Sequence, residues 1–172
     1  MTVFVERGFS LLELMIAIAI TAFLVVAAAP SLNYVMNYGA LNGAQTQIRS
    51  ALQMARAEAI KRGESVFVIP FSATNDDANE FGNGVLVWVD LDDDGIYDAG
   101  EEIAEVNDLV DVMVDLQPNA TSLSFSSEGR LEQNQTEYRF EVCKPADNEG
   151  YAIEVASRSG SIVSRNKNNC NV

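Results

Sequence analysis

The sequence predicts an α+β fold, in which one long N-terminal helix packs on a mostly antiparallel β-sheet. Residues 9–63 have the apolar pattern of a helix in two halves, the first apolar throughout and the second amphipathic. After Gly63 the apolar period changes to two, and β-branched and aromatic residues become frequent. A helix followed by many short strands linked by turns is typical of the α+β class.

The first half of the helix has the length of a membrane crossing. Phe9 to Ala29 is an almost unbroken apolar run, and about 20 such residues span a bilayer. We therefore expect a transmembrane helix at 9–30, after a short leader at 1–8. A secretory signal peptide is the alternative, but the run has no small-x-small cleavage site before a polar segment. Pro30 either ends this helix or bends one that continues.

Glu13 is the one charged residue within the apolar run. A carboxylate in lipid costs about 2.5–3.5 kcal/mol on insertion scales, so it needs a partner. Cleavage between Gly8 and Phe9 would create a positively charged amino terminus one helical turn from Glu13. The same carboxylate could attract the amino terminus of a neighbouring subunit, and either pairing lowers the cost of burial.

The second half of the helix, at 31–63, has an apolar stripe on one face. Apolar side chains recur there at helical spacing, at Leu41, Ala44, Ile48, Ala51, Leu52, Ala55 and Ala59. Gly63 follows Lys61 and Arg62, a pattern that is typical of a helix end. The stripe predicts that this half lies against a globular domain at 64–172.

The globular domain is expected to consist of short strands without an internal repeat. Alternating apolar residues between turn signals mark eight of them. We expect strands at 65–71, 85–90, 102–107, 111–116, 121–126, 136–143, 151–156 and 161–164.

The composition narrows the classes of function. A net charge of −14 disfavours nucleic acid as a partner. The sequence has no histidine, no glycine-rich phosphate loop and no nucleophile with a visible base, so we expect neither an enzyme nor a required cofactor. Cys143 and Cys170 would form a disulfide in an exported domain, worth about 2–4 kcal/mol, and would stay as thiols in the cytosol.

The motif Arg7-Gly8-Phe9-Ser10-Leu11-Leu12-Glu13-Leu14 resembles the signal of type IV pilins and type II secretion pseudopilins. The resemblance implies that prepilin peptidase cleaves after Gly8 and N-methylates Phe9, and that Glu13 acts in assembly. It also implies a pilin fold, a single pass through the inner membrane, a periplasmic C-terminal domain, and assembly with other pilins or pseudopilins into a filament.

Two further segments resemble the FimT/FimU and GspH group of minor pilins and minor pseudopilins. They are Ala55–Gly63 and Gly84–Asp90, the latter followed by an acidic turn and Gly100-Glu101-Glu102. The implied role is a low-abundance subunit that primes or caps a type IV pilus. A GspH-like minor pseudopilin of type II secretion and a DNA-binding tip pilin for transformation are the alternatives.

The acidic turn has the spacing of a calcium loop, D-x-D-x-D-G-x5-E. Calcium takes six to eight oxygen ligands, which here would come from Asp90, Asp92, Asp94, the carbonyl of Ile96, and Glu101. However, strands rather than helices are expected to flank the loop, unlike in an EF-hand. The alternative is a hairpin loop in which Asp and Gly serve turn geometry.

A possible DNA site lies near the C-terminus. Some FimT-like proteins bind DNA through a Gly-Arg-x-Arg motif, but the corresponding segment here, Ser159–Val163, lacks both arginines. Three cations nearby, Arg158, Arg165 and Lys167, could form a small local patch. The alternative is that they are solvated charges at strand ends.

Overall fold

The computed structural model describes residues 9–72, 81–92, 94–107, 109, 112–118, 120–132, 137–144 and 148–170, without the side chains of 27–37. The chain divides into two compact units, Met1–Tyr38 and Gly39–Val172, and each is described by itself. The predicted leader at 1–8 lies outside the described residues.

The first element is a single helix, α1, at Leu11–Arg62. It continues through Pro30, so the proline does not end it. Ser10 precedes the helix, and its carbonyl accepts a hydrogen bond of 3.1 Å from the Leu14 N–H. At the other end, Gly63 has a φ of 74° and donates its N–H to the Ala59 carbonyl at 2.9 Å. Glycine adopts this left-handed conformation without a steric penalty, which explains why the helix stops there.

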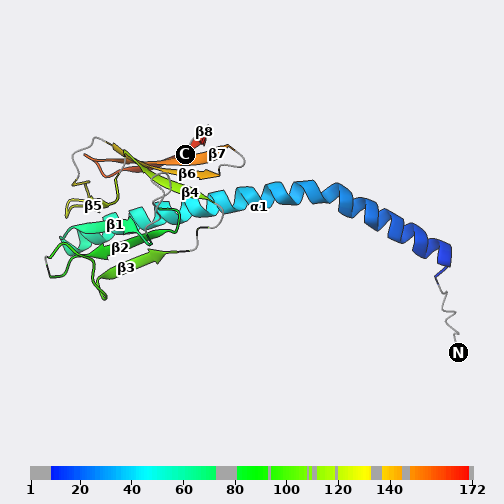
Figure 1. Ribbon diagram of the computed structural model, residues 1–172, viewed down its shortest axis with the longest axis horizontal. Helices are drawn as coiled ribbons and strands as arrows, with labels where there is room; N and C mark the ends of the chain where they lie inside the picture. Colours follow the sequence, from blue (N-terminus) through cyan, green and yellow to red (C-terminus); the bar gives the residue numbers. More distant parts are fainter. Residues whose placement is uncertain are drawn as a thin grey trace, which may run out of the picture. The chain divides into compact units, whose positions relative to one another are not determined.

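The globular unit contains two four-stranded antiparallel sheets rather than one. Sheet A has the order β3-β2-β1-β5, with β1 at Val66–Pro70, β2 at Val85–Val89, β3 at Glu102–Val106 and β5 at Leu123–Phe125. Sheet B has the order β4-β6-β7-β8, with β4 at Met113–Gln117, β6 at Glu137–Lys144, β7 at Glu149–Ala156 and β8 at Ile162–Asn168. Figure 1 shows the two sheets as separate layers beside the last turns of α1.

One hydrophobic core joins α1 to both sheets. The predicted helical stripe is confirmed, since each of its seven members is at most 4% exposed. Sheet A contributes alternate valines of β1 and β2, and sheet B contributes apolar residues of β4, β6 and β7. The side chains that face the helix from the sheets include Val66, Val68, Val85, Val87, Val114, Leu116, Phe140, Val142, Ile153 and Val155. The amphipathic pattern therefore positions the helix between two apolar sheet faces.

Polar bonds also join α1 to β8 and to two turns of the globular unit. The Arg56 guanidinium donates to the carbonyls of Gly129 (3.0 Å) and Ser159 (2.9 Å), which lie in two different turns. These turns approach closely at Gly160, where an added Cβ would lie 1.8 Å from the Gly129 carbonyl oxygen. Toward the other end of the stripe, the Gln45 amide donates to the Ser164 hydroxyl at 2.7 Å.

The part of the chain that the structure describes has the eight strands predicted, but β8 was predicted too short. The sequence predicted residues 161–164, whereas β8 continues to Asn168. Its second half pairs Arg165, Asn166 and Lys167 with β7. Because these residues are polar, the apolar alternation that marks a strand ends before the strand does. The β4 strand begins two residues later than predicted, at Met113.

We predict that Leu52→Ala destabilises the globular unit by about 2–5 kcal/mol, because Leu52 is 0% exposed and its removal leaves a cavity. Urea unfolding of the full chain in mild detergent, followed by the fluorescence of its single tryptophan, would measure this. The neighbouring Gln53→Ala, on the exposed side of α1, should change the stability by less than about 0.5 kcal/mol. Equal effects of the two variants would contradict the assignment of the buried face.

Candidate functional site

The predicted processing site lies at the start of α1. Gly8 is outside the described residues, whereas Phe9 is 80% exposed just before the helix. Glu13 is exposed in the first turn of α1, where a carboxylate interacts favourably with the positive end of the helix. Ser10 and Glu13 also have the S-x-x-E spacing of a capping box, a signal that the sequence prediction missed. The motif thus has the residue pattern of a helix start, and its role in pairing stays a prediction.

The first turns of α1 expose apolar side chains on every side. From Leu11 to Val26 the large apolar residues are 51–76% exposed, and consecutive positions such as Leu14, Met15 and Ile16 point in different directions around the helix. The Thr21 hydroxyl donates to the Ala17 carbonyl at 2.6 Å, so this polar group is bonded within the helix. A helix that is apolar all round is normally buried in a membrane or a large core.

Among the described residues, no helical segment combines the length and the hydropathy that a membrane crossing requires. The transmembrane segment at 9–30 and the domain boundaries drawn from it therefore stay predictions.

The acidic turn connects β2 to β3, so strands flank it as expected. One carboxylate oxygen from each of Asp90, Asp92 and Asp94 lies within 4.8 Å of the others. The Asp90 carboxylate also accepts the N–H groups of Asp94 (3.2 Å) and Gly95 (2.8 Å), which shapes the turn. Partial loss of hydration, reinforced by the charge of Asp94, raises the pKa of Asp92 above its ordinary value. A cation at the three aspartates would relieve this repulsion.

The fourth predicted carboxylate, Glu101, is not part of this group. Glu101 is 6% exposed, and its carboxylate accepts the N–H groups of Leu91 (2.8 Å) and Asp98 (2.9 Å). Ile96 has its N–H bonded to the Asp94 carboxylate at 2.7 Å. Glu101 therefore closes the loop onto its own backbone, so three of the four predicted carboxylates come together and calcium binding stays a prediction.

We predict that calcium at millimolar concentration binds the three aspartates and raises the melting temperature of the chain, because the cation neutralises their mutual repulsion. Isothermal titration calorimetry and a thermal shift assay would measure this, with Asp92→Asn as the variant and Glu64→Gln as a control. Absence of both heat and thermal shift in the unmutated chain would exclude calcium.

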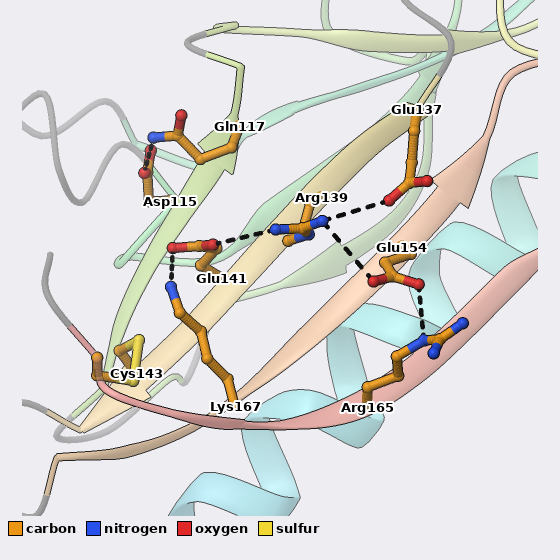
Figure 2. Close-up of polar contacts among 10 residues, drawn as sticks. Asp115, Gln117, Glu137, Arg139, Glu141, Cys143, Glu154, Arg165 and Lys167 are labelled. Carbon is orange, nitrogen blue, oxygen red and sulfur yellow. Dashed lines mark hydrogen bonds and ion pairs between the residues drawn. A yellow bond between two sulfur atoms is a disulfide. The ribbon is translucent and has the colours of Figure 1, made fainter.

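The three predicted DNA-binding cations do not form a basic patch. Figure 2 shows Arg165 paired with Glu154, at 2.8 Å, and Lys167 paired with Glu141 on the face of sheet B. Arg139 lies between them and pairs with Glu154 (3.8 Å) and Glu141 (3.9 Å), as well as with a third carboxylate, Glu137 (3.6 Å). Three cations face three carboxylates in this network, so its charges cancel. Arg158 lies apart from it, in the turn between β7 and β8.

We predict that the chain does not retard double-stranded DNA in a gel at low salt and tens of micromolar protein, because Arg165 and Lys167 are already neutralised. A Glu141→Gln/Glu154→Gln variant removes two of the neutralising charges and should bind more strongly than the unmutated chain. Retardation by the unmutated chain that is lost in Arg165→Ala would contradict this prediction.

The two cysteines form a disulfide between β6 and the segment after β8. Cys143 and Cys170 have Cα atoms 5.6 Å apart. Both residues are buried, at 0% and 7% exposure. The disulfide is the pairing expected for an exported domain, and it holds the C-terminal segment against sheet B.

One protein family and one sequence motif match this chain. Type II transport protein GspH matches residues 44–160, and the prokaryotic N-terminal methylation motif matches residues 4–29. Comparison with curated proteins gave no match.

Two solved structures have a similar fold, both of the type IV minor pilin FimU from Pseudomonas aeruginosa strain PAO1. The crystal form in space group P65 is 20% identical over 76% of this chain and 99% of that chain, with a TM-score of 0.54. The form in P21 is 18% identical over 79% of this chain and 98% of that chain, with a TM-score of 0.61. The predicted α+β pilin fold is thus confirmed.

Proposed function

The chain belongs to the family of type II transport protein GspH, which matches residues 44–160, and on that premise we propose that it is a minor pilin. In this role it is a structural subunit that primes or caps a type IV pilus. Prepilin peptidase removes residues 1–8 and methylates the amino group of Phe9, consistent with the methylation motif matched at 4–29. The family is structural, and no catalytic step is needed for this function.

The observation that carries the proposal is the apolar first part of α1. Its large side chains are at least half exposed over Leu11–Val26, which would be unfavourable in water by about 25 cal/mol per Å² of apolar surface. The inner membrane would cover this surface before assembly, and the apolar core of a filament would cover it afterwards. The exchange replaces one apolar environment with another, so the helix need not be exposed to water during extraction.

Glu13 can align the helix during assembly by pairing with a positive charge. In an apolar environment the carboxylate is stabilised by a positive partner, and the amino terminus created at Phe9 is the nearest one that processing supplies. The partner can belong to the same chain or to a neighbouring subunit. An intermolecular pair would align the incoming helix in register with its neighbour, because the chain has no other charged residue between Phe9 and Arg49. The periplasmic C-terminal unit, whose last segment the disulfide holds against sheet B, then distinguishes this subunit from the others.

A minor pseudopilin of type II secretion is the second candidate, because the matched family is named for a type II transport protein. Deletion of the gene separates the two candidates. Loss of twitching, with secretion of exoproteins unchanged, would support the pilus, and the reverse would support the secretion system. DNA uptake scored in the same strains would test the transformation role.

We predict that the mature chain begins with N-methylated Phe9, and that Glu13→Gln is still cleaved but is at least about tenfold depleted from sheared filaments. The substitution preserves size and removes the charge that pairs with the amino terminus. Intact-mass spectrometry identifies the first residue of the mature chain. Immunoblots of sheared and membrane fractions measure how much of the chain enters filaments.

Glu64→Gln makes the same chemical change at an exposed position after α1 and serves as the matched control. A mature chain with any other first residue would refute the proposal. Normal incorporation of Glu13→Gln would remove the pairing from the mechanism.

A further inference from the structure

A groove runs between α1 and β3 in the globular unit. Its volume is about 590 Å³, within the range of ligand sites in proteins. Gly43, Gln47 and Met54 of α1 lie along one wall, and Ala104 and Val106 of β3 lie along the other. The walls present mostly small or apolar side chains, and the groove is open along its length.

The β3 wall is the free edge of sheet A. Within the described residues β3 pairs only with β2, and Figure 1 shows it at the outer edge of the sheet. An edge strand has backbone N–H and C=O groups available to a further strand. Ala104 and Val106 pair with Val87 and Val85, which belong to the core, so these side chains of β3 face α1. A strand added to β3 would place alternate side chains over the same face, above the helix.

The α1 wall leaves room for those side chains. A Cβ added at Gly43 would have no atom within 4 Å. Glycine inside a helix costs about 1 kcal/mol relative to alanine, and neither the packing nor the dihedral angles of this chain require it at Gly43. The absence of a side chain at Gly43 leaves room for a side chain of a bound partner. Ala51 and Ala104, both small, continue this clearance along the groove.

The negative charge on β3 beside the groove favours a cationic partner. Glu102 and Glu105 are exposed on β3, and no described cation forms an ion pair with Glu105. The acidic turn with Asp90, Asp92 and Asp94 leads into β3 just before Glu102. A second copy of this chain, at a net charge of −14, would be repelled. A segment with lysine or arginine would be attracted.

We propose that this groove binds an extended, cationic segment of another pilin-type subunit, which pairs with β3 as an additional strand. The proposal rests on the proposed function, since it takes the partner from the same assembly. Small apolar side chains of the segment enter the space above Gly43 and Ala51, and a lysine or arginine reaches Glu105. This form of recognition combines main-chain hydrogen bonds for affinity with side-chain pockets for specificity.

A photo-crosslinking amino acid at Gln47 of the full chain tests the proposal in cells that contain the assembly machinery. Mass spectrometry of the cross-linked peptides should identify one segment of another subunit, with a lysine or arginine beside the cross-link. Glu105→Lys should lower the cross-linking yield about tenfold, because like charges then meet at the rim. Glu64→Lys, with the same change of charge at an exposed position outside the groove, should leave the yield unchanged.

Cross-links only to lipid, to a second copy, or to a segment without a cation would overturn the proposal, as would equal yields in Glu105→Lys and Glu64→Lys. Processing and the filament content of the chain are measured in the same cells, so failure of the proposed function is seen separately. Cross-linking is scored in membrane and filament fractions alike, and the groove is therefore tested even where the chain does not enter filaments.

Discussion

The main physical constraint on this chain is that one helix has two apolar surfaces of different kinds. Over Leu41–Ala59 the apolar residues form a single stripe, and the two sheets bury it completely. Over Leu11–Val26 they surround the helix, and the described part of the chain does not bury them. The first surface stabilises the globular unit, whereas the second requires an environment outside the chain. An anchored, assembling subunit satisfies both requirements.

The sequence predicted the buried stripe well because helical periodicity reports burial directly. Every member of the stripe is buried, and α1 ends at Gly63 as Lys61, Arg62 and Gly63 indicated. Strand positions followed from the alternation of apolar residues wherever one face of a strand is in the core. The signal failed for the second half of β8, because polar residues continue the strand there and ion pairs, not apolar contacts, cover its face.

The candidate sites were less predictable, because they depend on contacts between segments distant in sequence. The calcium spacing included Glu101, but that carboxylate is bonded to the backbone of Leu91 and Asp98 inside the loop. Arg165 and Lys167 appeared as local cations, whereas strand register places Glu154 and Glu141 beside them. No pattern in the sequence predicts the close approach of Gly160 to Gly129, which Arg56 bridges from the helix.

Strand register also makes the distribution of charge uneven, and this bears on assembly. Three cations and three carboxylates pair on the face of sheet B, so this network adds nothing to the net charge of −14. Much of the described excess negative charge lies at the β2–β3 turn and on β3 itself, in Asp90, Asp92, Asp94, Asp98, Glu101, Glu102 and Glu105. A neighbouring subunit therefore meets a network of paired charges on sheet B and an acidic edge on sheet A. Because like charges repel at the acidic edge, identical copies cannot approach one another there as readily as a cationic partner can. A subunit of this kind would be incorporated beside a different partner rather than in runs of itself, which is the behaviour required of a minor component.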